Sequence, residues 1–378
     1  MGEIKLSSDE FLHMMLVDGS FIIQLLRDLS KNNFDEVPSL SRWNNVEQVP
    51  YLSRWMLPTI RRELIMLENQ LPLFVLNKLF ELTDNTLVPS QPCMSLNDLA
   101  FKFFYRLLQS DKSPECKKDY EFEIKHVLDL LRSNIRFKSG GKDKRGNQKQ
   151  MIRSITELTE AGVKIKAADK NQELLDISFE KKWGVVMREL TIPRLHISDH
   201  RGTVFRNMVA FEKCHKRCYP DVTTYMFFFN RLINSANDVA ILHYKDVLHH
   251  SLGNDQHVAE LINDITKEIV PDMNESYLHK VVNEANEYFG TRYAKSRASL
   301  VRHYLTSWTV GISTLGAILA LYFTFLQTIC GFADALKKNS LQSPTFGSII
   351  KEAFVLPFRD GLNSLASKTF RFRHTRKP

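Results

Sequence analysis

The sequence predicts a mainly α-helical protein with a small antiparallel β insertion and one C-terminal transmembrane helix. Three observations lead to this class. Apolar residues recur at helical spacing over much of residues 1–137 and again over 203–304. Short segments rich in β-branched residues fall between 163 and 197. The 29 residues Leu305–Ala333 include no Asp, Glu, Lys or Arg, and a run of about 18 such residues is a transmembrane candidate.

The first helix is expected to begin at the sequence Ser7-Ser-Asp-Glu10. Acidic and hydroxyl side chains here can accept hydrogen bonds from the free N–H groups of a first helical turn. The apolar residues of FLHMMLVDGSFIIQLLRDL then follow at helical spacing, with Gly19 as a candidate bend.

The next helical block covers Leu57–Leu82 and is interrupted by Pro72. Proline is tolerated in a first helical turn, so Pro72 is expected to open a second helix. Asn69 or Gln70 is expected to satisfy backbone groups at the joint. Further helices are predicted at 95–109 and 118–134.

The pattern changes after residues 138–150, a charged, glycine-containing stretch predicted to be a linker or loop. Strands are predicted at Val163–Ile165, Leu174–Phe179, Val185–Leu190 and Arg194–Ile197, forming an antiparallel sheet, with Pro193 at an edge or a bend. Helices follow at 203–216, 222–242, 256–269 and 275–304. The predicted parts are therefore a helical part (1–137), the linker, a mixed part (151–304), a membrane span (305–333) and a basic tail (334–378).

The predicted span carries aromatic and small residues as well as aliphatic ones. The pairs Ser313/Ala317 and Gly316/Ala320 place small residues four apart, which can let a second helix approach closely. Self-association through this helix is therefore one possible interaction. The residues taken to mark the span are Leu305, Trp308, Gly316, Ala320, Tyr322, Phe325 and Ala333.

The net charge of +8 is concentrated at the C-terminus. Residues 334–378 hold nine Lys or Arg and three Asp or Glu, a net of +6, which leaves about +2 for all preceding residues. This distribution argues against a basic nucleic-acid-binding domain and favours contact between the tail and anionic lipid headgroups. The expected lipid contacts are Arg371, Arg373, Arg376 and Lys377.

Cysteine usage indicates a reducing compartment, and the N-terminus matches neither of two targeting motifs. Five cysteines are too few, and odd in number, for a disulfide framework. The start MGEIKLSSDE lacks the basic region and apolar core of a signal peptide. Leu6 stands where a myristoylation motif needs Ser or Thr.

Four local patterns have the spacing of a known site but lack its other residues. Gly141 and Gly146 have phosphate-loop spacing but are followed by Asn147 and Gln148. Cys214 and Cys218 lack a second ligand pair for zinc and are interpreted as buried or half-buried structural thiols. His196 and His200 have no intervening catalytic glutamate, and His249-His250 is expected in a solvated turn. We therefore predict no catalytic residue, no cofactor and no metal site.

Several stretches resemble the plant family named domain of unknown function 247. They are FLHMMLVDGSFIIQLLR, LENQLPLFVLNKLF, ELTEAGVKIK, LLDISF, LTIPRLHI, VFRNMVAFEKC, LINSANDVAIL and the late apolar run. They occur in the family's order over about residues 10–333. Family members usually have a further N-terminal segment containing a sequence like VVSIGPYHHG, so this chain resembles a shortened member with a longer tail.

The resemblance implies a membrane-associated, mostly helical plant protein and supplies no catalytic residues. Some members are linked to self-recognition between grass pollen and stigma. Three functions remain open: a single-pass recognition or signalling protein acting by contact with an unknown protein partner, an enzyme with an unrecognised site, and a lipid-surface binding protein. The charges flanking the span, four before and three after, do not decide its orientation or the type of membrane.

Overall fold

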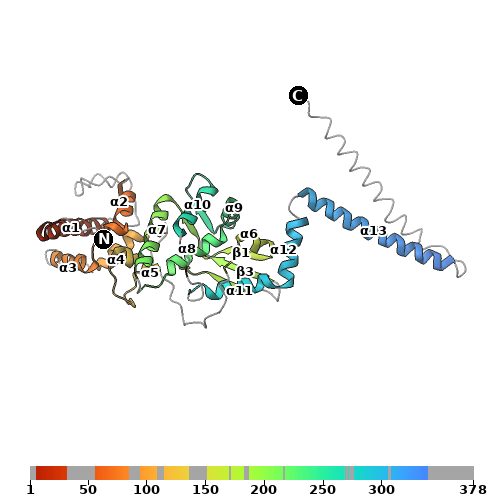
Figure 1. Cartoon of the computed structure of the whole chain (residues 1–378), viewed down its shortest axis with the longest axis horizontal. Helices are drawn as coiled ribbons and strands as arrows, with labels where there is room; N and C mark the ends of the chain where they lie inside the picture. Colours follow the sequence, from red (N-terminus) through yellow and green to blue (C-terminus); the bar gives the residue numbers. More distant parts are fainter. Residues whose placement is uncertain are drawn as a thin grey trace, which may run out of the picture. The chain divides into compact units, whose positions relative to one another are not determined.

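Helices make up most of the described chain, and the strands are short (Figure 1). The computed structural model describes residues 6–31, 56–84, 94–108, 115–135, 151–169, 172–182, 187–215, 218–267, 269, 271, 276–304 and 308–338. The chain divides into two units, Met1–Ser299 and Leu300–Pro378. The predicted class of a mainly α protein with a small sheet and one helix suited to a membrane is confirmed.

Of the N-terminal helices, α3 (Leu73–Asp84) and α4 (Leu96–Tyr105) pack against α1 (Ser8–Lys31), whereas α2 (Leu57–Leu64) and α5 (Val127–Ile135) pack against α7 (Asp199–Cys214). The 3-10 turn η3 (Leu67–Asn69) follows α2 in the chain. The predicted start of α1 is confirmed, because Glu10 N donates to Ser7 Oγ over 3.3 Å while Ser7 N donates to Glu10 Oε2 over 2.9 Å. α1 is one continuous helix through Gly19, so the candidate bend does not divide it.

Gly19 instead marks the close approach of α1 and α3. A Cβ atom at Gly19 would lie 2.6 Å from Cδ1 of Leu79. α3 begins directly after Pro72, so the predicted joint is confirmed at this point. The helix predicted over 118–134 is confirmed only in its second half, because the chain between 115 and 126 is irregular with a few bends.

The strands form two small sheets rather than one antiparallel sheet, and residues 174–177 of the predicted strand Leu174–Phe179 lie outside any strand. The first contains β1 (Val163–Ala167), β3 (Met187–Ile192) and β2 (Ser178–Lys182), in that spatial order. β2 and β3 are antiparallel, but β1 and β3 are parallel. The prediction of a wholly antiparallel sheet was wrong because alternation of apolar residues shows which face is buried, not the order of strands. Here β3 inserts between β1 and β2.

The second sheet joins segments far apart in the sequence. β4 (Leu195–Ile197) pairs in parallel with β5 (Leu248–His250). Buried Pro193 lies between β3 and β4, as expected for a bend. The prediction that His249-His250 forms a solvated turn was wrong, because both residues belong to β5 and pair with His196 and Ile197.

The remaining helices enclose the main core of the first unit. They are α6 (Ile155–Glu160), α7 (Asp199–Cys214), α8 (Asp221–Leu232), α9 (Ala236–Tyr244), α10 (Asp255–Thr266), α11 (His279–Gly290) and α12 (Arg292–Tyr304). α8 is buried along most of its length, and α7 and α10 pack against it. The predicted helices 222–242 and 275–304 are each divided in two, near Ser235 and Thr291.

Polar residues at helix starts fix these divisions. Ser235 and Asp238 form a reciprocal capping box at the start of α9. Ser154, Ser198 and Asn254 accept hydrogen bonds from the first turns of α6, α7 and α10. Figure 1 shows that, within the first unit, α1–α4 gather at one end and the first sheet and α11 at the other.

Candidate functional site

A long apolar surface in the described part of the second unit is provided by α13 (Trp308–Lys338). Its window Ile312–Ala333 has 22 residues and a mean hydropathy of 1.8, and none of the window is buried. Leu321 and Phe332 are about 70% exposed, at 71% and 69%. Among the described helices, α13 alone has the length and composition to cross a membrane, whereas a core helix of a soluble protein would be mostly buried.

α13 contains most of the residues predicted to mark the span. It begins at Trp308 and continues five residues beyond the predicted end at Ala333. Leu305 and residues 339–378 lie outside the described residues. Placed on α13 are Gly316, Ala320, Tyr322, Phe325 and Ala333, whereas the tail residues Arg371, Arg373, Arg376 and Lys377 and the linker 138–150 are not described.

Among the described residues, no packing contact requires a glycine at position 316 of α13. A Cβ atom at Gly316 would have no heavy atom within 4 Å. Gly316 and Ala320 are four residues apart on one continuous helix, as are Ser313 and Ala317. Both pairs therefore lie on a helical surface along which another helix can approach.

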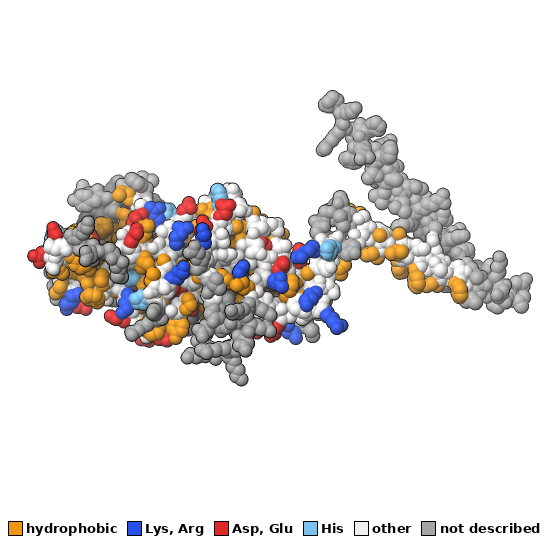
Figure 2. Space-filling view, viewed as in Figure 1, with side chains coloured by type: hydrophobic (Ala, Val, Ile, Leu, Met, Phe, Trp, Pro, Cys, Tyr) orange, Lys and Arg blue, Asp and Glu red, His pale blue; other side chains and the backbone are white. Residues whose placement is uncertain are grey.

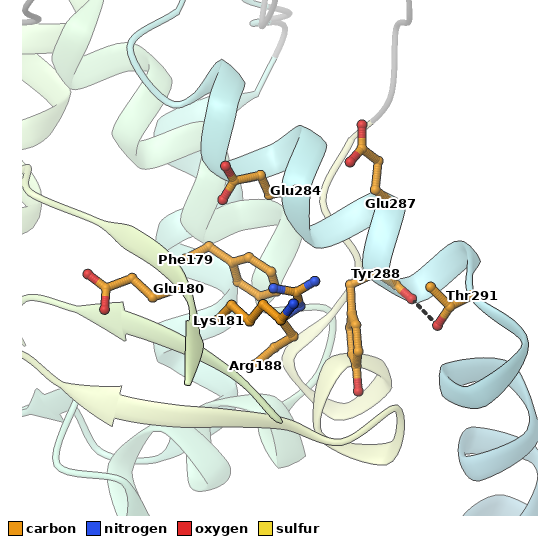
Figure 3. A pocket seen from close by; sticks show the side chains of 8 residues that line it. All are labelled: Phe179, Glu180, Lys181, Arg188, Glu284, Glu287, Tyr288 and Thr291. Atoms are coloured by element: carbon orange, nitrogen blue, oxygen red, sulfur yellow. Dashed lines mark hydrogen bonds between the residues drawn. The ribbon is translucent and has the colours of Figure 1, made fainter. Parts of the chain in front are cut away.

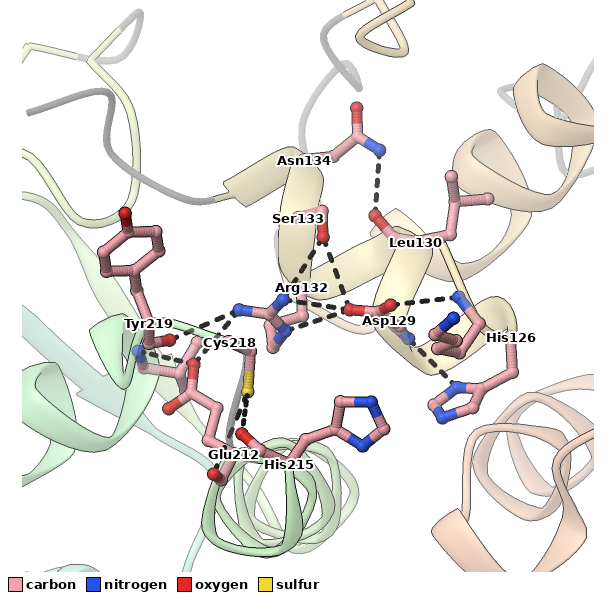
Figure 4. A network of polar contacts seen from close by, with 12 residues as sticks. His126, Asp129, Leu130, Arg132, Ser133, Asn134, Glu212, His215, Cys218 and Tyr219 are labelled. Carbon is pink, nitrogen blue, oxygen red and sulfur yellow. Dashed lines mark hydrogen bonds and ion pairs between the residues drawn. The ribbon is translucent and has the colours of Figure 1, made fainter. Parts of the chain in front are cut away.

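In the first unit, a buried ionic network joins α5 to α7 (Figure 4). Arg132 Nη2 donates to Asp129 Oδ1 over 2.9 Å, and Arg132 Nη1 lies 3.5 Å from Glu212 Oε1. All three side chains are at most 7% exposed. Burial lowers the pKa of Arg132, but the charges of Glu212 and Asp129 outweigh this effect and raise it. Arg132 therefore stays charged in the core.

Glu212 also caps a helix that lacks a cap of its own. The residue before α8 is Pro220, which provides no side-chain cap. Glu212 Oε2 accepts hydrogen bonds from Thr223 N over 2.8 Å and Thr223 Oγ1 over 2.6 Å, and Oε1 accepts one from Val222 N over 3.2 Å. Burial raises the pKa of Glu212 to about 7, against the lowering effects of Arg132 and these donors.

His126 completes one side of this network. Its Nδ1 accepts a hydrogen bond from Asp129 N over 3.2 Å. Burial lowers the pKa of His126 to about 4, so the ring is neutral near pH 7 and can accept this bond. The network consequently joins α5, α7 and α8 through groups that satisfy one another, which is a structural role.

A second polar cluster lies where β5 follows α9. His249 Nε2 lies 2.7 Å from Asp246 Oδ1, and Arg194 Nε donates to Asp246 Oδ2 over 2.8 Å. His196 Nε2 lies 3.1 Å from Ser251 Oγ, but His196 Nδ1 has no hydrogen-bond partner to orient the ring. A nucleophile and base need such an orienting group, so this pair lacks one element of a catalytic triad.

The other sequence candidates are dispersed. Among the residues that the structure describes, no group of three or more His, Cys, Asp or Glu could hold a metal ion. Cys218 is half-buried as predicted, but the expectation for Cys214 was wrong, because it is exposed at the last turn of α7. The glycines of the phosphate-loop pattern, 141 and 146, lie outside the described residues.

A family model described as "Plant protein of unknown function", DUF247, matches residues 1–323 of the chain. The chain belongs to this family. The resemblance of the separate sequence stretches is thereby confirmed, and the match includes the first part of α13.

Two curated relatives of the DUF247 chain come from Arabidopsis thaliana. The UPF0481 protein At3g47200 is 28% identical over 372 residues, which cover 90% of this chain and 72% of the relative. The putative UPF0481 protein At3g02645 is 29% identical over 177 residues, covering 47% of this chain and 32% of the relative. No solved structure matches the chain.

The sequence interpretation missed Arg132, Asp129 and Glu212 as a cluster. The available signal was a charged residue on the apolar face of a helix, since Glu212 follows Phe205, Met208 and Val209 at helical spacing. That signal marks a buried charge but does not identify its partner, because Arg132 is 80 positions away in the sequence.

Proposed function

We propose that this DUF247 chain is a single-pass membrane protein whose first unit acts in recognition or signalling by protein–protein contact. The observation that supports the anchor is the fully unburied apolar window Ile312–Ala333 on one continuous helix. Leaving such a surface in water is costly, at about 25 cal/mol per Å² of apolar area, whereas lipid removes that cost. The basic tail is assigned to anionic headgroups in the same membrane.

Contact with a protein is supported by an exposed apolar surface in the first unit. Leu12, Leu16 and Val17 of α1 are 64%, 51% and 52% exposed, and Phe74 of α3 is 70% exposed. Figure 2 shows hydrophobic side chains gathered over these N-terminal helices. Contiguous exposed apolar surface on a folded unit is typical of an interaction site.

The core of the first unit, in contrast, is filled. Large side chains such as Phe101, Phe205 and Tyr225 are fully buried, and the ring of Phe205 in α7 contacts that of Tyr225 in α8. A filled core together with an exposed apolar face favours binding over catalysis in an internal cavity.

The anchor is tested by expressing the full chain in plant cells and extracting membranes with alkaline carbonate. We expect the wild-type chain to stay in the pellet and the double variant Leu319→Arg, Leu321→Arg to be released, because two charges at the helix centre oppose insertion. The matched control Leu12→Arg, Leu16→Arg changes α1 and should remain in the pellet. Release of the wild-type chain by carbonate would refute the anchor.

The contact function is tested separately by proximity labelling from the full chain in the same cells. We expect a reproducible set of neighbouring proteins that is lost in the Leu12→Arg, Leu16→Arg variant but retained in a variant with two Arg substitutions at exposed Lys78 and Glu81. An identical set for all three proteins would count against the α1 surface. Protease protection of tags at each end then gives the side of the membrane on which the first unit lies.

A further inference from the structure

A pocket in the first unit lies between the β2–β3 pair and α11 (Figure 3). Its volume is about 620 Å³, which falls within the range of small-molecule sites. Its lining combines Lys181 of β2 and Arg188 of β3 with two aromatic rings, Phe179 and Tyr288. No sequence motif marks this pocket.

Two cations face each other in the pocket. Lys181 and Arg188 are direct cross-strand partners in the β2–β3 register. Like charges directly opposite each other destabilise an antiparallel pair. Within the part of the chain that the structure describes, neither cation forms an ion pair, and the buried Nε of Arg188 has no hydrogen-bond partner. The two cations therefore have no ion-pair partner, although the carboxylates of Glu180, Glu284 and Glu287 also line the pocket.

The acidic residues of the same two strands are compensated, including Glu180, which also lines the pocket. Glu180 and Glu189 are also direct cross-strand partners. Each has its own lysine, since Lys182 Nζ lies 2.9 Å from Glu180 Oε2 and Lys164 Nζ lies 3.4 Å from Glu189 Oε2. Within these two strands, only the pair of Lys181 and Arg188 lacks a counter-charge. An anionic ligand would supply it.

The aromatic residues hold Arg188 in place. Its Cζ lies 5.7 Å from the ring centroid of Tyr288, within cation–π range. The Tyr288 hydroxyl donates to Ala161 O over 3.1 Å, which fixes that ring, and the Phe179 ring centroid lies 6.5 Å from it. A guanidinium positioned in this way loses little freedom when it forms hydrogen bonds to an oxyanion.

Two carboxylates of α11 restrict the charge of the ligand. Glu284 and Glu287 line the pocket, and Figure 3 shows their carboxylates turned away from Lys181 and Arg188. They would repel a ligand with several anionic groups. They can accept hydrogen bonds from hydroxyl or ammonium groups on a ligand with one anionic group.

We propose that this pocket binds a small phosphomonoester whose remainder carries hydroxyl or ammonium groups. A phosphomonoester carries about −1.5 to −2 charges near pH 7 and three acceptor oxygens, which match two cations better than a single carboxylate does. The same chemistry is offered by a soluble ester and by the headgroup of phosphatidic acid. This proposal does not depend on the contact function proposed above.

The test is calorimetric titration of the full chain in a neutral detergent with glycerol 3-phosphate. We expect saturable binding that weakens about tenfold or more in Lys181→Gln and in Arg188→Gln, because each removes a charge-assisted interaction. Arg188→Lys, which keeps the charge but loses the planar fork, should be intermediate. Lys182→Gln is the matched control, since Lys182 pairs with Glu180 and does not itself line the pocket, and it should bind like the wild type.

A parallel titration with short-chain phosphatidic acid in the same detergent separates the two sources. Tighter binding of the lipid, lost in Arg188→Gln, would assign a headgroup, and tighter binding of glycerol 3-phosphate would assign a soluble ester. Absence of saturable binding by both ligands overturns the proposal. Equal weakening by Lys182→Gln and Lys181→Gln also overturns it, because that result indicates only nonspecific charge attraction. Lys181→Gln relieves the repulsion and keeps the Arg188–Tyr288 contact, so this variant should unfold no earlier than the wild type.

Discussion

The backbone N–H of Leu128 donates a 3.0 Å hydrogen bond to Oε1 of Gln70, 58 residues earlier in the chain. The Gln70 amide nitrogen also donates to the carbonyl oxygens of Leu64 and Met66, each over 2.8 Å. One side chain thus satisfies the end of α2 and the first turn of α5. The prediction that Asn69 or Gln70 serves the joint before α3 is confirmed, and Gln70 extends that role to a distant helix.

We expect Gln70→Ala to lower the free energy of unfolding of the first unit by about 2–4 kcal/mol, because it leaves three backbone groups without their partner. Asn69→Ala is the control, since exposed Asn69 makes one hydrogen bond, of 3.0 Å, to Glu63 O. Its cost should be about 1 kcal/mol or less. Urea unfolding of the full chain in detergent, followed by circular dichroism, measures both. Equal losses would show that Gln70 does not link the two helices.

Glu212 should make stability depend on pH. Its pKa rises from an ordinary value of 4.5 to about 7 in the folded chain, because burial disfavours the carboxylate. The folded state therefore holds a proton that the unfolded state releases between these values. This contribution is fully present below pH 4.5 and is lost as pH rises through about 7, amounting to about 3 kcal/mol at 1.36 kcal/mol per unit.

The measurement compares the wild type with Glu212→Gln, which keeps the shape and an acceptor oxygen but cannot titrate. We expect the difference in unfolding free energy, wild type minus variant, to fall between pH 4.5 and about pH 7, the window set by the two values above. Comparing the two proteins cancels the titration of the other carboxyl groups. A difference that rises with pH over this window would mean that Arg132 stabilises the carboxylate more than burial disfavours it.

Gly162 occupies a backbone conformation that L-residues rarely adopt. Its φ is +98°, and it follows α6 at the point where Arg297 Nη1 donates to Thr159 O over 2.9 Å and to Glu160 O over 2.6 Å. We expect Gly162→Ala to destabilise the first unit by about 1–2 kcal/mol, because Cβ would be strained and close to the Arg297 side chain.

Gly253→Ala is the comparison for that change, because its nearest contact would be 3.7 Å, to His257 Nδ1, at ordinary van der Waals distance. Its effect on the thermal midpoint should be small. If both alanine variants unfold at the same temperature, then the positive φ at Gly162 does not make alanine destabilising at that position.

If α13 self-associates through its small residues, then larger side chains at those positions should weaken the pairing of two helices. Gly316→Leu and Ala320→Leu should each reduce energy transfer between donor- and acceptor-labelled full chains in lipid vesicles by about twofold or more, because close backbone approach is blocked. Ala333→Leu adds the same bulk outside the two small-residue pairs and should leave transfer unchanged. Transfer that is unaffected in all three variants would exclude these pairs as the interface.

The helices with strong periodicity and polar starts were predictable from sequence. Ser7 and Glu10 mark the start of α1 because a cap is made by residues three positions apart, and a local pattern can show it. The same reasoning failed at α8, whose start is capped by Glu212 from another helix. It also failed for the strand order, because β3 lies between β1 and β2 through an arrangement that period-two alternation does not encode.

The sequence by itself determined the family, the helical class and the apolar helix with its small residues, because each depends on residue type and local spacing. Only the tertiary structure decided which distant groups meet. Arg132 with Glu212, Gln70 with Leu128, and Lys181 with Arg188 are each brought together by packing or strand register. Buried hydrogen bonds and charges need specific partners, and the fold alone sets the separation of residues far apart in the chain.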